Sequence, residues 1–365
     1  MKSSNNIYLE RVDILRFLAA TLVIFWHYLH YSIIPLTYVP DFFAFSILQE
    51  GHTGVSLFMV LSGFIFQYIN NGKEINYPQF FKNRFFRIFP LALFWILLLV
   101  ARDNLNSVEA LLNTLFMFHS RAVPGVGWTI VVECQFYLIF PVLHKVIERK
   151  GGILNVLGLI AFMILLRCML YVNLSDVRDF GYYSIFGRLD QFLIGMIAAK
   201  LYSSSEFVRK TSYQSLRLGL FFIVIITFLE LFHIFNLAGG YHGMVATHAK
   251  SAIWIVFHDF EALFYALIIT LFLSLKKYKI LSPIETFFAK CGEFSYSMYW
   301  LHWPAIQALC IMMIRFGIGY PGRGDFAEIL LIGFVIIVPV IVFLSALSYN
   351  FFEKPFLQFR NKYDV

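Results

Sequence analysis

Charged side chains are scarce in this 365-residue chain, in which Asp, Glu, Lys and Arg together make up 14% of the residues. Hydrophobic residues make up 59%, and the mean hydropathy is +0.72. A soluble domain cannot bury so much apolar surface in a single core, so the composition argues against a soluble globular protein. The sequence therefore predicts a polytopic membrane protein.

Cysteine is scarce as well, and the signatures of several familiar enzyme classes are missing. The four cysteines show no CxxC spacing, which argues against a disulfide framework and against a zinc site. No histidine is followed by an aspartate five positions later, so the HxxxxD acyltransferase signature is absent, and so are HExxH, GxSxG and the P-loop. We expect no metal and no permanently bound cofactor.

Long apolar runs are what the chain has in abundance. Each helical crossing of a bilayer needs about 20 predominantly apolar residues, which leads us to expect ten spans. The predicted spans cover residues 14–31, 54–70, 85–101, 129–147, 153–172, 185–202, 216–235, 253–275, 296–316 and 327–349. The predicted fold class is therefore all-α, a transmembrane helix bundle in which residues 1–365 form one domain.

The distribution of basic residues orients this bundle. With the N-terminus in the cytoplasm, twenty of the 29 Lys and Arg residues fall on the inner side, five on the outer side and four within spans. Cytoplasmic loops are enriched in both residues, so we expect both termini to be cytoplasmic. The net charge of +7 follows from this topology, and because no basic stripe is interleaved with aromatic residues, we expect the lipid bilayer as a partner and no nucleic acid.

Arg16 and His27 are ionisable residues inside the first apolar run. They are eleven positions apart, so they lie on one helical face, roughly 16 Å from each other along the axis. An ionisable residue at membrane depth is a functional-site hypothesis by default. Arginine suits a phosphate and histidine suits proton transfer. The alternative is structural, with Arg16 reaching the interface or pairing with Asp13, and His27 bonding a neighbouring helix.

Two further stretches place charge near or inside predicted spans. In FKNRFFRIFP, Arg84 and Arg87 are three positions apart and form a cationic patch, although positive-inside topology alone would also explain them. In GWTIVVECQFYLIFP, the carboxylate of Glu133 is deep enough to need a partner, either a histidine or an intramembrane arginine such as Arg188. Trp128 is an interfacial or packing residue, or stacks on a sugar.

The stretch FSYSMYWLHWP contains a second histidine within a predicted span. Ser295, Tyr299 and His302 follow i, i+4, i+7 spacing and line one helical stripe. Hydroxyl and imidazole groups on one face are typical of a polar channel wall, whereas hydrogen bonding between helices would explain them without chemistry. Glu353, near the end of the chain, is expected at the interface, paired with Lys354 or an inner-loop arginine.

Taken in order, seven stretches resemble the acyltransferase-3 family of integral membrane acyltransferases over nearly the whole chain. The first is the pair Arg16 and His27, which ten residues separate. The others are GVSLFMVLSGF at 54–64, RFFRIFP, WTIVVECQFYLIFP, GRLDQFLIG, SYSMYWLHWP and FFEKPF. One such stretch would be weak evidence, but seven in the expected order are specific. The chain resembles the members that lack the C-terminal SGNH-type domain carried by others.

The resemblance implies transfer of an acyl group, commonly acetyl, from cytoplasmic acyl-CoA to a hydroxyl of a carbohydrate or lipid-linked glycan. It also implies that Arg16 and His27 are essential. On the donor side, we expect Arg16, Arg84 and Arg87 to hold the phosphates of coenzyme A. The expected compartment is a bacterial inner membrane.

On the acceptor side, His27 is expected to act as general base or to carry the acyl group transiently, with Glu133 fixing or charging its imidazole. His302 and Tyr299 are expected to stabilise the oxyanion or to line the acceptor path. Two rival interpretations remain. A transporter or flippase would also need a polar passage, although no paired broken segments support it. A membrane-bound O-acyltransferase of the other multi-span family would use His302 and leave the Arg16 and His27 pair unexplained.

Overall fold

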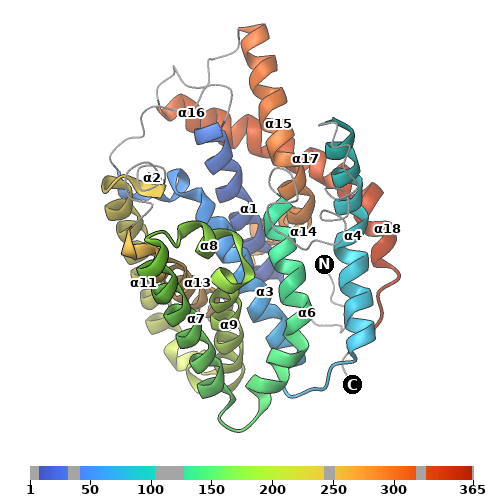
Figure 1. Ribbon diagram of the computed structural model, residues 1–365. Helices are drawn as coiled ribbons and strands as arrows, with labels where there is room; N and C mark the ends of the chain where they lie inside the picture. The colour runs from blue at the N-terminus through green and yellow to red at the C-terminus, as the bar shows by residue number, and fades with distance from the viewer. Residues whose placement is uncertain (1–7, 32–41, 103–126, 242–250, 318–325, 364–365) are drawn as a thin grey trace.

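The computed structural model describes residues 8–31, 42–102, 127–241, 251–317 and 326–363, and within these ranges the regular elements are helices (Figure 1). The long helices are α1 (Glu10–Tyr31), α3 (Gly54–Asn70), α4 (Tyr77–Arg102), α6 (Trp128–Glu148), α7 (Gly152–Leu174), α9 (Ile185–Ser204), α11 (Gln214–Leu237), α13 (Phe257–Ser274) and α15 (Ser295–Phe316). The shorter ones are α2 (Phe43–Gln49), α8 (Arg178–Tyr183), α10 (Glu206–Arg209), α14 (Ser282–Glu293), α16 (Phe326–Ile332), α17 (Val338–Ser348) and α18 (Lys354–Leu357). The all-α prediction is confirmed.

Seven segments in the described ranges are long and apolar enough to cross a membrane. They are Glu10–Tyr31, Gly51–Asn70, Trp128–Glu148, Gly152–Leu174, Thr211–Leu237, Phe257–Ser274 and Ala327–Leu357. The other three predicted spans are also helical and lie on α4, α9 and α15. The chain is an integral membrane protein, and the count of ten spans and the cytoplasmic termini stay predictions.

Several boundaries differ from those that hydropathy alone suggested. The helix α4 begins at Tyr77, eight residues before the predicted span, so Arg84 and Arg87 lie well inside it. The predicted span 253–275 is interrupted at Val256, because a short 3-10 turn, Ala252–Ile255, precedes α13. The short helices α2, α8, α10 and α14 were not predicted, since they lie outside the long apolar runs.

Close backbone contact joins α3 to α9 in the centre of the bundle. A Cβ atom added to Gly63 would collide with the backbone of Phe192, and one added to Gly195 would collide with the carbonyl oxygen of Val60. Small residues at such positions let membrane helices approach each other closely. The glycines in the LSGF and LIGM stretches therefore fix α3 against α9, and α3 carries several of the residues that line the cavities described below.

A buried ion network lies beside this contact. Arg167 of α7 donates to Asp190 of α9 and to Asp259 of α13, each at 2.5 Å, and its side chain is fully buried. It also donates to the carbonyl oxygens of Gly187 and Ile255, at 3.3 and 2.7 Å. One fully buried guanidinium thus connects three helices.

The C-terminal part of the bundle is one nearly continuous helical run from α16 to α18, and its last part, residues 349–357, lies beside α4 (Figure 1). Two π-helical stretches interrupt it, Gly333–Ile337 and Tyr349–Glu353. Such stretches often occur at functional sites, where they change the direction in which a side chain points. Here the second one ends on Glu353, whose buried carboxylate pairs with Arg87 of α4.

Candidate active site

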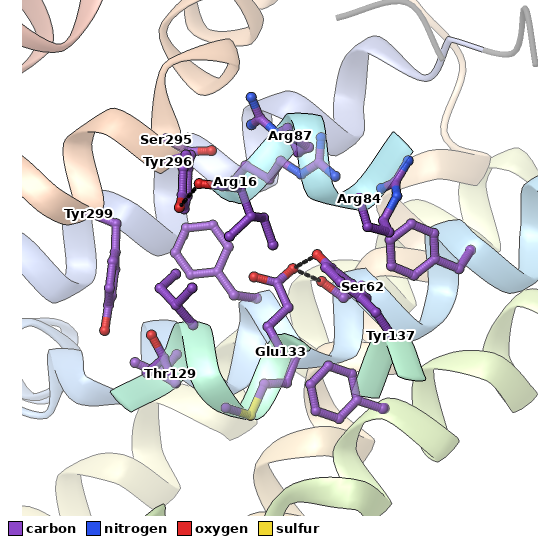
Figure 2. Close-up of a pocket in the computed structure, with 17 residues that line it drawn as sticks. Arg16, Ser62, Arg84, Arg87, Thr129, Glu133, Tyr137, Ser295, Tyr296 and Tyr299 are labelled. Atoms are coloured by element: carbon purple, nitrogen blue, oxygen red, sulfur yellow. Dashed lines mark hydrogen bonds between the residues drawn. The ribbon is translucent and has the colours of Figure 1, made fainter. Parts of the chain in front are cut away.

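A cavity of about 110 Å³ gathers the arginines that the sequence singled out, and we call it the arginine cavity. Helices α1, α3, α4, α6, α9 and α15 contribute its walls. Its polar lining consists of Arg16, Arg84, Arg87, Ser62, Thr129, Glu133, Tyr137, Ser295, Tyr296 and Tyr299, all labelled in Figure 2. Apolar side chains fill the rest of the wall. A charged ligand with an apolar or flexible extension would match this lining.

A second cavity, of about 240 Å³, is lined mainly by aromatic side chains, and we call it the histidine cavity. Its lining consists of Val23, Trp26, His27, Tyr31, His52, Val55, Trp128, Tyr182, Tyr183, Tyr241, Tyr299 and Trp303. Aromatic rings with polar edges suit a ligand that has both apolar faces and hydroxyl groups.

The two cavities share part of their walls. Val55 of α3 and Tyr299 of α15 line both of them, and both side chains are buried. Arg16 and His27, which the sequence placed on one helical face, therefore lie on opposite sides of this shared wall. A reaction that used both residues would have to take place at the wall.

The three arginines of the arginine cavity differ in their partners. Arg16 is paired with Asp13 at 2.9 Å, as the i, i+3 spacing suggested, and Arg87 is paired with Glu353. The guanidinium of Arg84 lies instead over the ring of Phe66, 4.8 Å from its centroid. In the part of the chain that the structure describes, Arg84 has no ion pair, and its buried Nε has no hydrogen-bond partner. Arg84 is thus the arginine best placed to take an anionic ligand group.

Glu353 was expected at the interface, paired with Lys354 or an inner-loop arginine. The pairing with an arginine is confirmed, because Arg87 belongs to the basic stretch expected on the inner side, but the side chain of Glu353 is only 1% exposed. It accepts from Ser297 of α15 at 2.6 Å in addition to Arg87 of α4. Glu353 is the last residue of the second π-helical stretch.

Glu133 has two hydrogen-bond donors in the arginine cavity. The hydroxyl of Ser62 donates to its carboxylate at 3.1 Å, and the hydroxyl of Tyr137, one turn further along α6, donates to the same oxygen (Figure 2). The alternative pairing of Glu133 with Arg188 is wrong. Arg188 lies in a different buried cluster, 3.9 Å from Glu261 and 3.1 Å from the Ser56 hydroxyl.

No contact between Glu133 and either of the two predicted histidines occurs among the described residues, because Glu133 faces the arginine cavity and His27 faces the other one. The partner of His27 is His302. The Nε2 atom of His302 lies 3.2 Å from the Nδ1 atom of His27, and the two helices α15 and α1 supply one ring each.

The hydrogen bonds of the two rings fix which nitrogen carries the proton. His302 Nδ1 lies 2.6 Å from the carbonyl oxygen of Tyr299, which can only accept, so Nδ1 carries hydrogen and Nε2 is an acceptor. His27 Nδ1 lies 2.9 Å from the carbonyl oxygen of Val23 and near His302 Nε2, so it also carries hydrogen. The lone pair of neutral His27 is therefore on Nε2.

His302 is fully buried and lines neither cavity, so the structure places it behind His27 rather than against a ligand. Trp128 lines the histidine cavity, where its ring lies 5.0 Å from the rings of both Tyr182 and Tyr183. The guanidinium carbon of Arg188 lies over the Tyr182 ring, 4.4 Å from its centroid, and so holds that ring in place.

Several residues of the site were missed by the sequence analysis, and His52 is one of them. His52 lines the histidine cavity, and its Nε2 lies 3.1 Å from the carboxylate of Glu50, which in turn accepts from the backbone N–H of Tyr241. The only signal in the sequence was its position two residues before the stretch GVSLFMVLSGF. Among the described residues, no group of three or more His, Cys, Asp or Glu is arranged to hold a metal ion.

Comparison with known proteins identifies the family of the chain. The sequence profile described as an acyltransferase domain, acyltransferase-3, matches residues 9–349. ORF330 of Acidianus two-tailed virus, provisionally named an acetyltransferase, is 25% identical over 87% of this chain and 90% of its own length. The O-acetyltransferase OatA of Staphylococcus aureus is 23% identical over 84% of this chain, which spans about half of OatA, 53%. No solved structure matches the chain.

The family match covers almost all of the described bundle, including both cavities and the helices that build them. It also contains the arginines of α4 and the paired histidines of α1 and α15. The chain belongs to the acyltransferase-3 family of membrane acyltransferases.

Proposed function

We propose that this enzyme moves an acetyl group from cytoplasmic acetyl-CoA to a hydroxyl of a cell-surface carbohydrate, such as O-antigen, exopolysaccharide or a related glycan, in a bacterial inner membrane. The observation that carries the proposal is the pair of cavities that share Val55 and Tyr299. One side offers arginines for a phosphorylated donor, and the other offers an imidazole lone pair among aromatic rings.

The donor would enter the arginine cavity with its phosphates at the guanidinium groups. Arginine binds phosphate through parallel N–H donors that match the geometry of the phosphate oxygens. Arg84 supplies the unpaired charge, while Arg16 and Arg87 remain held by Asp13 and Glu353. The pantetheine arm would then extend along the apolar wall and bring the thioester carbonyl to Tyr299.

The acceptor would enter the histidine cavity, where Trp128, Tyr182 and Trp303 offer ring faces to the apolar side of a sugar. His27 Nε2 would take the proton from the acceptor hydroxyl while the oxygen attacks the thioester carbon. The C–S bond then breaks, and the proton passes to the departing thiolate. His302 would hold the His27 ring in the tautomer that this step needs.

Glu133 would act on the donor side rather than on His27. Its carboxylate lines the same cavity as three arginines, so it balances part of their charge when no donor is bound. Tyr299, which lines both cavities, is placed to donate a hydrogen bond to the carbonyl oxygen as negative charge develops there.

The test of this proposal is mass analysis of cell-surface glycans from cells with and without the chain. We expect the glycan repeat unit to lose the mass of one acetyl substituent when the chain is absent. An unchanged glycan, together with altered uptake or export of an anionic solute, would contradict the proposal and favour a transporter.

The variant Arg84→Ala tests the donor site. We expect the Kd for acetyl-CoA to rise about 10- to 100-fold, because a hydrogen bond to a charged group contributes about 1.5–3 kcal/mol. The measurement is equilibrium binding to purified protein. Arg84→Lys should lose less affinity, since lysine keeps the positive charge and lacks only the parallel N–H donors of the guanidinium. The matched control is Lys82→Ala, an exposed cation on the same helix, and an equal loss in that variant would refute a specific role for Arg84.

A further inference from the structure

A short 3-10 turn, Gly51–Thr53, precedes α3 and brings His52 against α1. A Cβ atom added to Gly51 would lie 2.1 Å from the carbonyl oxygen of Leu22 and 3.2 Å from the backbone nitrogen of Trp26. Only glycine lets two backbones approach so closely. His52 is the next residue along the chain, so this contact fixes it on the turn of α1 that ends at Trp26.

Aromatic rings enclose the imidazole of His52 at the wall of the histidine cavity. Its centroid lies 4.9 Å from a ring of Trp26 and 4.7 Å from the ring of Tyr241, and the ring of Tyr182 is 6.0 Å away. The residue is only 2% exposed, and it lines the cavity. A side chain that is locked by packing in this way presents its polar atoms in one orientation.

One ring nitrogen of His52 is occupied by a carboxylate. Its Nε2 atom lies 3.1 Å from the side chain of Glu50, which is itself buried and accepts from the backbone N–H of Tyr241 at 3.1 Å. An ionised carboxylate can only accept, so Nε2 carries hydrogen and the lone pair of the neutral ring is on Nδ1.

The other ring nitrogen of His52 is available to a ligand. Within the described ranges Nδ1 has no hydrogen-bond partner, and unlike Nε2 of His258 it is not a partnerless atom closed off in the protein interior. Because His52 lines the histidine cavity, this lone pair is an acceptor for whatever occupies that cavity. A polar atom held in place there, with nothing to bond, indicates a ligand with a hydrogen-bond donor.

The rest of the lining indicates what kind of donor that is. As far as the structure describes the lining of the histidine cavity, it contains no Asp, Glu, Lys or Arg, so the cavity suits a neutral ligand. Tyrosine hydroxyls can donate there, and the two imidazoles can accept. His27 Nε2 is assigned to the hydroxyl that reacts, which leaves His52 Nδ1 for a different one.

We propose that His52, held by Glu50, binds a second hydroxyl of the acceptor glycan, one that is not acetylated. This hydroxyl donates to Nδ1, while Nε2 stays bonded to Glu50. That the ligand is a glycan rests on the function proposed above. His52 would then be a specificity-determining residue, because it sets which hydroxyl of the sugar reaches His27, and Glu50 would be a positioning residue that keeps the lone pair on Nδ1.

The experiment uses purified protein in neutral detergent with radiolabelled acetyl-CoA as donor. The acceptor is the unacetylated repeat unit released from cells that lack the chain, together with synthetic versions in which one hydroxyl at a time is replaced by hydrogen. The variants are His52→Ala and Glu50→Gln. If His52→Ala does not fold, as judged by thermal unfolding, Glu50→Gln decides, because it keeps the shape of the pair.

The matched control is Gln49→Ala. The side chain of Gln49 accepts from Asn236 of α11 at 2.8 Å, next to the contact between Glu50 and Tyr241, but it lines neither cavity. The control therefore loosens the same contact between α2 and α11 without touching the acceptor.

We expect the KM for the repeat unit to rise about tenfold in His52→Ala, the effect of one lost hydrogen bond, while kcat changes by less than about threefold. Glu50→Gln should act similarly, because its amide can donate to Nε2 and so leave the ring hydrogen on Nδ1. The Kd for acetyl-CoA should stay the same in both variants, and Gln49→Ala should match the wild type.

The deoxy acceptors identify the hydroxyl. With the wild type, one of them should show the same rise in KM as the His52→Ala variant shows with the complete repeat unit. That acceptor should lose nothing further in His52→Ala, because the partner is already missing.

An unchanged KM in His52→Ala, or the same losses in the variant as in the wild type for every deoxy acceptor, overturns the assignment of His52 while the proposed function stands. A fall in kcat as large as that of His27→Ala would make His52 the base, and an equal loss in Gln49→Ala would make the contact between α2 and α11 the cause. Both results overturn the assignment. If the wild type binds acetyl-CoA but transfers nothing to the repeat unit, the proposed function fails, and the assignment fails with it.

Discussion

The His27→Ala variant is expected to lose acyl transfer by about 10²- to 10⁴-fold, the range that a positioned general base contributes. Its affinity for acetyl-CoA should change little, because His27 lines the histidine cavity and the donor phosphates would lie in the arginine cavity. The loss should therefore appear in the turnover number rather than in donor binding. Transfer of radiolabelled acetyl to membrane glycans, measured beside equilibrium donor binding, separates the two quantities.

Two further variants make this test specific to the reacting imidazole. His30→Ala changes the next histidine of α1, which lines neither cavity, and should keep most of the activity. His302→Ala should lose less than His27→Ala, because His302 acts through the ring of His27 rather than on the acceptor. Full acetyl transfer by His27→Ala at normal protein level would rule out both the general-base route and an acyl-histidine intermediate.

The Arg167→Met variant is expected to lower the free energy of unfolding by about 3–5 kcal/mol, the usual cost of removing one partner from a buried ion pair. The change leaves Asp190 and Asp259 without the guanidinium that now bonds both of them at 2.5 Å. It also removes the donor to the carbonyl oxygen of Ile255 at the break before α13. Denaturant-induced unfolding of purified protein in detergent measures the effect.

Arg167→Met with Asp190→Asn and Asp259→Asn should recover part of the lost stability, since the amides leave no uncompensated charge. The comparison variant is Lys200→Ala. Lys200 pairs with Glu148 at 2.6 Å, but the two side chains are 28% and 22% exposed, so we expect a loss of only about 0–1 kcal/mol. Equal losses in Arg167→Met and Lys200→Ala would show that burial does not set the strength of the network.

Contacts within one helix were the part of the site that the sequence could predict. The i, i+3 spacing of Asp13 and Arg16 led to the pair that forms, and the spacing of Arg84 and Arg87 placed both on one cavity. Helical periodicity relates such residues directly, so no knowledge of neighbouring helices was needed. The apolar runs located the main helices for the same reason. Their boundaries were wrong where α4 begins eight residues before the apolar run and where a 3-10 turn precedes α13.

Contacts between distant helices could not be predicted, because they depend on which helices become neighbours. Glu353 lies 266 residues after Arg87, so no spacing in the sequence pointed to this particular arginine. Glu133 was expected to pair with a histidine or an intramembrane arginine, and it has two hydroxyl donors instead. His52 was left without a role, since nothing near it in sequence reveals that Glu50 and the aromatic wall enclose it.

Under the proposed function, the enzyme draws one substrate from each side of the membrane, and a continuous polar passage between the two substrates would let ions cross. In this bundle the buried side chains of Val55 and Tyr299 line both cavities and so form part of the layer between them. A hydrated ion would have to shed its water to pass such a layer, and the apolar surroundings offer few groups to replace that water. A neutral acetyl group bears no such penalty. The same two side chains would then keep the ion permeability of the bundle low while the carbonyl and methyl groups of the acetyl group pass between the cavities.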